Sequence, residues 1–231
     1  MKKITNTVVF KYEEQDKNLI NELGTYIDEK LPAIYEFFKI NMKNEKVIIN
    51  IIAKKDELDT IHRRFNDLEE NVEVPKWLIG FSASDMQIYY LSLNAYKSTT
   101  HVFSLSEYYE KLIEYKKTIL HECIHYVNRL FCKENNCHFS CRFLAEGIAL
   151  YLSNQMEGKS LKFDYSIESI LNSNSCYNGW YLVTKYILEK YSCEKFLELL
   201  KDSKMAELFL KEEFLNIRDY YFNLEKYGRE N

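Results

Sequence analysis

The sequence contains very few residues that interrupt regular secondary structure, with only two prolines and six glycines among 231 residues. No stretch rich in proline, glycine or serine marks a flexible linker, and there is no internal repeat or low-complexity tract. The sequence therefore predicts a single folded domain over residues 1–231, with a sheet-containing part over 1–100 and a helical part over 101–231.

Long hydrophobic runs are also missing. No apolar stretch approaches the roughly 18 residues that a membrane-spanning helix requires. Residues Met1 to Asn6 include two lysines, but no apolar segment follows them, as it would in a secretory signal peptide. We therefore expect a cytoplasmic protein that does not bind membranes.

An excess of positive charge is absent as well. The 31 Lys and Arg residues are outnumbered by 35 Asp and Glu residues, which gives a formal net charge of −4. This balance offers no basic surface for nucleic acid, so nucleic acid is not an expected partner. The hydrophobic content of 46% is enough to bury a substantial core in a chain of this length.

Three segments rich in β-branched and aromatic residues are predicted to be strands: residues 5–12, 46–53 and 86–93. Helices are predicted for residues 16–42, with Pro32 as a point where the helix can break, and for residues 56–65. Ser104 and Glu107 form a capping-box pattern, and from there the chain is predicted to be helical to its C-terminus. Together these elements indicate an α+β fold, with a small N-terminal mixed sheet and a mainly helical C-terminal half.

The segment from Thr118 to Val127 has the strongest chemical signature. It holds His121 and His125 four residues apart, a spacing that places both imidazoles on one face of a helix, and Glu122 follows the first histidine. Two imidazoles at this spacing suit zinc, and the carboxylate is placed to act on a zinc-bound water. Both histidines lie outside the apolar face of the same helix. That face, the apolar arc, is formed by Ile119, Leu120, Cys123, Ile124, Val127, Leu130 and Phe131. The alternative is a helix whose histidines are surface residues or hydrogen-bonded core residues.

A second segment, from Phe143 to Leu152, is apolar nearly all round and carries Glu146 as its only charge. A buried carboxylate is costly unless it is paired or binds a metal. Twenty residues separate His125 from Glu146, enough to end one helix, turn through the polar residues 133–136 and return. Two histidines, one glutamate and a water form a catalytic type of zinc site. The alternative is a salt bridge between Glu146 and Arg142.

The combination of His121-Glu122-x-x-His125 with Glu146-Gly147-x-Ala149 resembles the gluzincin superfamily of zinc metallopeptidases. The resemblance implies one catalytic zinc ion with His121, His125 and Glu146 as ligands, and Glu122 as the general base. Residues 74–91 are similar to the strand that such domains place above the cleft, and residues 177–200 to their closing helices. Two positions depart from the family pattern: Ala145 replaces a polar residue, and Leu150 replaces an acidic one that orients a ligand.

This resemblance implies hydrolysis of a peptide or protein substrate. Zinc lowers the pKa of its water from 15.7 to about 7, and Glu122 would accept a proton as the hydroxide attacks a carbonyl. Tyr177, at the head of a predicted helix, is the candidate donor to the oxyanion, with Tyr181 in reserve and ordinary packing as the alternative for both. Residues 86–93, if they form an exposed sheet edge, could pair with an extended peptide.

Six cysteines occur, and without a secretory signal they are expected to be free thiols. Cys132, Cys137 and Cys141 cluster with His138 between the two site helices. A second, structural metal is the alternative there, although the paired Cys-x-x-Cys motifs of a zinc ribbon are missing. Cys123 lies on the apolar arc and is expected in the core. His62, His101 and His138 have no spacing that would bring them to the site.

Three interpretations of the chain follow. The first is a cytoplasmic zinc metallopeptidase that acts on peptides or on a protein. The second is a non-catalytic or regulatory zinc-binding protein that keeps the peptidase fold for peptide recognition. The third is a metal-free helical interaction domain. Glu122 favours the first over the second, because a binding module needs no base there, and Glu146 disfavours the third.

Overall fold

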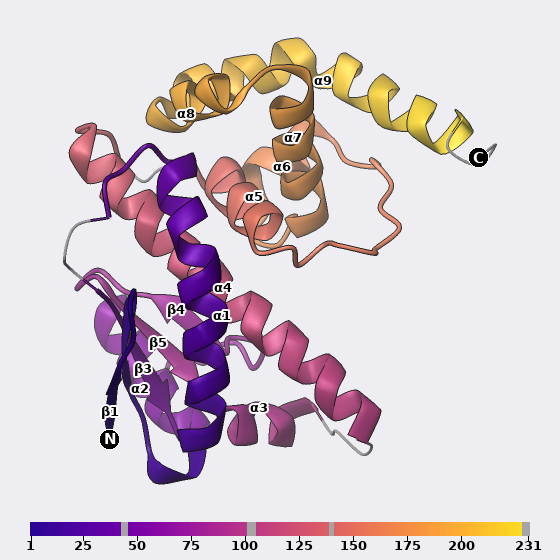
Figure 1. Cartoon of the computed structure of the whole chain (residues 1–231). Coiled ribbons are helices and arrows are strands. Elements are labelled where there is room, and N and C mark those ends of the chain that lie inside the picture. The colour runs from indigo at the N-terminus through magenta and orange to yellow at the C-terminus, as the bar shows by residue number, and fades with distance from the viewer. Residues whose placement is uncertain (43–45, 101–104, 139–140, 228–231) are drawn as a thin grey trace. The chain divides into compact units, whose positions relative to one another are not determined.

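A computed structural model of the chain describes residues 1–42, 46–100, 105–138 and 141–227 (Figure 1). Residue contacts divide the chain into two compact units, Met1–Val127 and Asn128–Asn231, and each unit is described by itself. The boundary falls inside the long helix α4 (Leu105–Glu134). A single domain over residues 1–231 stays a prediction.

Unit 1 contains a five-stranded mixed sheet with the order β1-β2-β3-β5-β4. The two inner pairs, β2 with β3 and β3 with β5, are parallel. Each outer strand is antiparallel to its neighbour: β1 pairs with β2, and β4 pairs with β5. The strands are β1 (Lys2–Ile4), β2 (Val8–Lys11), β3 (Val47–Ile52), β4 (Gly80–Ser82) and β5 (Gln87–Leu91). With the helices that follow, this sheet confirms the predicted α+β fold.

Each of the three predicted strand segments contains a strand, but the sequence missed β1 and β4. Both are three residues long, too short for an alternating pattern to be visible. Their presence changes the position of β5, which is hydrogen-bonded on one side to β3 and on the other to β4. The condition for pairing a peptide with residues 86–93, an exposed sheet edge, is therefore not met, because β4 is the outer strand on that side.

The N-terminal helices of unit 1 follow the prediction closely. They are α1 (Lys17–Phe37), which comes after a 3₁₀ turn at Glu14–Asp16, and α2 (Lys55–Phe65). Pro32 lies inside α1 without ending it. Although proline removes one backbone hydrogen bond, the buried side chains of Leu31 and Ile34 on either side hold the helix against the core. The helix ends before the predicted Met42, because Lys39 has a left-handed backbone with φ of 55°.

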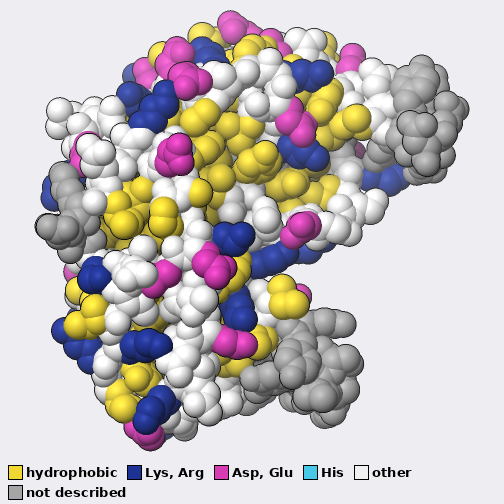
Figure 2. Space-filling model, in the orientation of Figure 1, with side chains coloured by type: hydrophobic (Ala, Val, Ile, Leu, Met, Phe, Trp, Pro, Cys, Tyr) yellow, Lys and Arg dark blue, Asp and Glu magenta, His cyan; other side chains and the backbone are white. Residues whose placement is uncertain are grey.

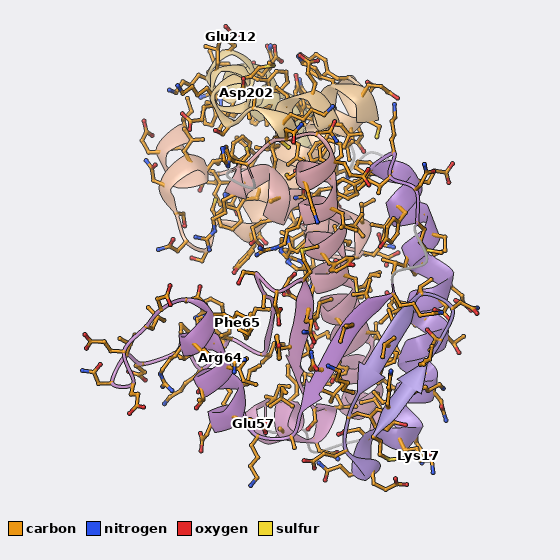
Figure 3. All side chains as sticks on the ribbon, turned by 90° about the vertical axis from the view of Figure 1, so that its left-hand side faces the viewer. Lys17, Glu57, Arg64, Phe65, Asp202 and Glu212 are labelled. Carbon is orange, nitrogen blue, oxygen red and sulfur yellow. The ribbon has the colours of Figure 1, made fainter. Side chains whose placement is uncertain are left out.

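Helix α2 packs on the β4–β5 edge of the sheet through aromatic side chains. The ring centroid of Phe65 lies 6.4 Å from that of Phe81 on β4 and 5.4 Å from that of Tyr89 on β5. Figure 3 shows Phe65 and its neighbour Arg64 at the C-terminal end of α2. The short strand β4 is thus covered by apolar contacts as well as paired by its backbone.

Helix α4 is held on β5 by two tyrosine hydroxyls, both in almost fully buried side chains. Tyr115 on α4 donates a hydrogen bond of 2.8 Å to the main-chain oxygen of Leu91. From the sheet side, Tyr90 donates to the hydroxyl of Thr118 on α4. The Thr118 hydroxyl in turn donates to the carbonyls of its own preceding helical turn. Because Thr118 lies one turn before His121, these bonds fix the rotation of the helix that carries the histidines.

Unit 2 is helical, with α5 (Arg142–Leu152), α6 (Ile167–Asn172), α7 (Tyr177–Lys190), α8 (Cys193–Lys201) and α9 (Ser203–Tyr227). The prediction of helix up to the C-terminus was wrong between α5 and α6. There Asn154 and Gly158 have left-handed backbones, with φ of 56° and 75°, which a continuous helix cannot contain. The capping box at Ser104 lies outside the described residues. Among the described residues, no helix has the length and hydrophobicity that crossing a membrane requires.

Gly80 should be required for the packing of β4 on β5. A Cβ atom at this position would lie only 2.0 Å from the ring of Tyr90. We expect Gly80→Ala to lower the free energy of unfolding by about 1–3 kcal/mol, measured by urea denaturation, because the ring must move. In a Tyr90→Leu background the same substitution should cost much less. Equal costs in the two backgrounds would contradict this contact.

Candidate metal centre

The two histidines of α4 direct their imidazoles at one point. Their Nε2 atoms are 2.9 Å apart, and the ring centroids are separated by 4.6 Å with the rings nearly perpendicular. Two nitrogens that are each about 2.0–2.1 Å from a tetrahedral zinc ion lie about 3.3 Å apart. The observed separation is slightly shorter, so His121 and His125 need only a small movement to share a metal ion.

The two histidines are more enclosed than their position outside the apolar arc suggests. The apolar arc is buried as predicted, apart from the half-buried Leu130. However, His121 and His125 are also buried, with 8% and 9% of their surface exposed, so the helix does not present them openly. Tyr126 and Asn128 are buried too, which shows that this part of α4 is enclosed on several sides. The two imidazoles thus lie in a setting of low polarity, where a bound cation interacts strongly with its ligands.

Glu122 follows His121 on α4 and is half-buried. Burial raises the pKa of the Tyr90 hydroxyl well above its ordinary value, and the negative charge of Glu122 acts in the same direction. Burial likewise raises the pKa of the Cys123 thiol, again with a contribution from Glu122. Glu122 thus acts electrostatically on Tyr90 of β5 and on Cys123, from the same helix as the histidines.

Helix α5 carries Glu146 among buried apolar residues, as predicted, although Glu146 itself is half-buried rather than fully buried. The next residue, Gly147, lies against α7. A Cβ atom there would be 2.1 Å from the hydroxyl oxygen of Thr184 and 2.4 Å from the main-chain oxygen of Trp180. Gly147 thus allows α5 and α7 to approach closely, and this approach fixes where Glu146 stands in unit 2.

Arg142 does not form the salt bridge with Glu146 that was the alternative to metal binding. Its guanidinium donates hydrogen bonds to the side-chain and main-chain oxygens of Asn174, at 2.8 and 3.1 Å. It also lies over the ring of Trp180, 5.5 Å from the centroid. These contacts occupy the guanidinium away from Glu146.

The three predicted ligand side chains are brought together. One ligand atom from each of His121, His125 and Glu146 lies within 4.8 Å of those of the other two. Within the described parts of the chain, this is the one group of three or more His, Cys, Asp or Glu side chains arranged closely enough to hold a metal ion. Two imidazole nitrogens and a carboxylate oxygen are a donor set that zinc accepts in catalytic sites.

The two tyrosines considered as oxyanion donors lie on α7. Tyr177 is the first residue of the helix, and its ring packs edge-to-face on Trp180 at a centroid distance of 5.2 Å. Tyr181 packs on Tyr151 of α5, with ring centroids 6.1 Å apart, and burial raises its pKa. Both tyrosines are therefore on the helix that contacts Gly147, and their catalytic role stays a prediction.

The cysteine and histidine residues outside the site behave as thiols and packing groups. All six cysteines are free, as predicted, and Cys123 is fully buried. Burial raises the pKa of Cys132 and of Cys141 to about 12. Among the described residues, neither belongs to a group of side chains close enough to hold a metal ion. The ring of His62 packs on Phe81. His138 is exposed, and His101 is outside the described residues.

Two cavities lie elsewhere in the described structure. In unit 1, a cavity of about 790 Å³ is lined by residues of α2, of the segment before β4 and of the short helix α3 (Leu93–Thr100), including the exposed Trp77. In unit 2, a smaller cavity of about 360 Å³ is lined by Tyr151, Tyr181 and Lys185 among others. Neither is lined by the histidines or by Glu146, so the candidate metal centre is distinct from both.

Sequence reasoning missed three residues that shape the centre. Tyr90 and Thr118 set the position of α4, and the motif around Glu146 gave no sign that Gly147 is a packing contact. The sequence predicted the metal-binding side chains of α4 and α5 but not these three contacts, because each contact joins segments far apart in the chain.

Comparison of the chain with protein-family models, with curated proteins and with solved structures finds no match.

Gly147→Ala should disturb the contact between α5 and α7. We expect the melting temperature to fall by about 5 °C or more, because a backbone oxygen cannot move away as a flexible side chain can. Thr184→Ala alone should be nearly neutral, since within the described structure its buried hydroxyl has no hydrogen-bond partner. Added to Gly147→Ala, it should restore only part of the stability. A Gly147→Ala protein as stable as wild type would refute the packing role.

Proposed function

We propose that the protein is a zinc metallopeptidase of the gluzincin type, in which His121, His125 and Glu146 bind one catalytic zinc ion. The observation that carries the proposal is the convergence of these three side chains, with Glu122 on the same helix as the histidines. A metal-binding module without catalysis needs the first three residues only. The presence of Glu122 therefore favours hydrolysis.

Each residue of the proposed site would have its own role in the hydrolysis of a peptide bond. A zinc ion held by His121, His125 and Glu146 would supply Lewis acidity, which lowers the pKa of water from 15.7 to about 7. Glu122 would act as the general base that takes up a proton from the attacking water and would later pass it to the leaving amine. Tyr177, with Tyr181 as the alternative, donates a hydrogen bond to the oxygen that becomes negative. The burial of the histidines limits competition from bulk water for the metal.

A peptide or protein substrate would be held by the outer edge of β4, in place of the internal β5. The N–H of Leu91 donates to the main-chain oxygen of Ile79, and the N–H of Ala83 donates to that of Gln87. The main-chain groups of Ile79 and Ala83, which flank β4, therefore point toward β5. By the alternation of an antiparallel pair, the main-chain groups of Gly80 point away from β5. They would pair with an extended peptide.

A cytoplasmic location is part of the proposal. All six cysteines are free thiols, and disulfides are rare in reducing compartments. Several of these thiols are buried, so they act as small hydrophobic core residues.

The 2.9 Å separation of the two Nε2 atoms also fits a second candidate, a metal-free helical domain. Two neutral imidazoles at this distance form a hydrogen bond in which one ring donates and the other accepts. In that case the histidines are core residues, and the protein binds no zinc. A zinc-binding but non-catalytic protein is intermediate between the two.

Metal content separates these candidates. Purified wild-type protein should contain about one zinc ion per chain, measured by mass spectrometry of the metal. His125→Ala should lower zinc affinity at least about 100-fold, because half of the imidazole pair is lost. His138→Ala, which changes an exposed histidine, should keep the metal. A wild-type protein that is folded and stays free of zinc after incubation with the ion would refute the site.

Turnover tests the role of Glu122. We expect Glu122→Gln to reduce cleavage of a peptide library by a factor on the order of 10²–10⁴ while zinc stays bound, because the amide cannot accept the proton. Glu114→Gln is the matched control, an exposed glutamate on the same helix, and should cleave like wild type. If Glu122→Gln retains full activity, Glu122 is not the base. If wild type binds zinc but cleaves nothing in the library, the non-catalytic candidate is favoured.

A further inference from the structure

Helix α9 has one face that is fully used in the packing of unit 2. Ala206, Leu210, Ile217 and Tyr221 are all buried. The hydroxyl of Tyr221 donates a hydrogen bond of 2.7 Å to the main-chain oxygen of Leu182 on α7. Ring contacts extend this face on both sides, from Phe209 to Tyr191 and from Phe214 to Phe163.

The opposite face of α9 carries a second apolar stripe that contacts solvent. Leu208, Leu215 and Phe222 are spaced by seven residues and are 55%, 59% and 66% exposed. At about 100° per residue these three side chains lie within roughly 40° of one another, on the side of the helix away from the buried face. A single exposed leucine needs no explanation, but three aligned over four turns of a well-packed helix indicate a surface that is covered in solution.

The charges beside this stripe are separated by sign. Lys204, Lys211 and Arg218 follow one side with the same seven-residue spacing, while Glu212 and Asp219 follow the other. Within the described structure no hydrogen bond or ion pair engages the side chains of Lys211 and Glu212, and only a long contact of 3.8 Å joins Arg218 to Asp219. Figure 3 shows Glu212 on the outer surface of α9, at the top of the view. Along the upper edge of Figure 2, where α9 runs, hydrophobic, acidic and basic side chains are all visible at the surface.

The geometry points to a second copy of this chain as the partner of this stripe, in a parallel pairing of two α9 helices about a two-fold axis along them. In this arrangement each residue of the apolar stripe contacts the same residue of the second copy. The basic side of one helix then faces the acidic side of the other. Lys211 then faces Glu212 of the second copy, and Arg218 faces Asp219, on both sides of the apolar stripe.

An antiparallel pairing would place like sides together, so the row of Lys204, Lys211 and Arg218 would face itself. Like charges at that position oppose association, which selects the parallel arrangement. A repeat of seven residues is also the repeat of parallel two-stranded coiled coils. The buried face of α9 lies away from the stripe, so the pairing leaves the packing of unit 2 unchanged. This inference is independent of the proposed peptidase function.

Sedimentation equilibrium of the full chain tests the pairing. Wild type should show a reversible monomer–dimer equilibrium between about 1 μM and 1 mM. Leu215→Glu should shift the dissociation constant at least tenfold toward monomer, with an unchanged circular dichroism spectrum. Ile113→Glu, at a similarly exposed position on α4, should dimerise like wild type. A wild-type protein that stays monomeric over this range overturns the proposal, as does a dimer that Leu215→Glu leaves intact.

Two further variants test the direction of the helices. Lys211→Glu should weaken the dimer, and the double exchange Lys211→Glu with Glu212→Lys should restore it, because opposite charges again face each other. Phe222→Cys should form a disulfide between two copies under mild oxidation, mapped by mass spectrometry, since the parallel pairing places residue 222 beside itself. A disulfide that forms only when Phe222→Cys is mixed with Leu208→Cys would show antiparallel helices and overturn the proposed arrangement.

Discussion

The attachment of α4 to β5 by two buried tyrosine hydroxyls is the interaction on which the candidate centre depends. Tyr115 reaches from the helix to the strand, and Tyr90 reaches from the strand to Thr118 on the helix. Turning α4 by one residue would rotate its side chains by about 100° and move both imidazoles away from their common point. Because these hydroxyls are buried, breaking either bond leaves a polar group without water, which strengthens the preference for this one register.

In unit 2 the position of α5 is constrained in a comparable way, by a glycine at its contact with α7. Gly147 lets α7 approach α5 more closely than any other residue would permit, and Glu146 is next to it in the chain. Two contacts of ordinary packing, one in each unit, therefore fix the parts of the chain that carry the donor atoms. The donors themselves contribute little to this positioning. In the proposed metal site, the rest of the fold would hold the ligands in place before a metal ion binds.

The sequence predicted well wherever one segment contains its own signal. The continuous apolar run of β3 and the histidine spacing on α4 needed no information from elsewhere in the chain. Features that arise between segments were missed. The internal position of β5 depends on the short strand β4, and the burial of His121 and His125 depends on what encloses α4. The end of α1 depends on a left-handed backbone at Lys39, which the residue type does not announce.

The central claim is that the two imidazoles of α4 and the carboxylate of Glu146 share one zinc ion. The most direct test is a crystal structure of the zinc-loaded protein, with anomalous scattering measured on both sides of the zinc absorption edge. The account predicts one anomalous peak about 2.0–2.1 Å from the Nε2 atoms of His121 and His125, and about 2.0–2.2 Å from an oxygen of Glu146. A zinc ion bound only at other residues, or a direct hydrogen bond between the two imidazoles with no metal present, would contradict it.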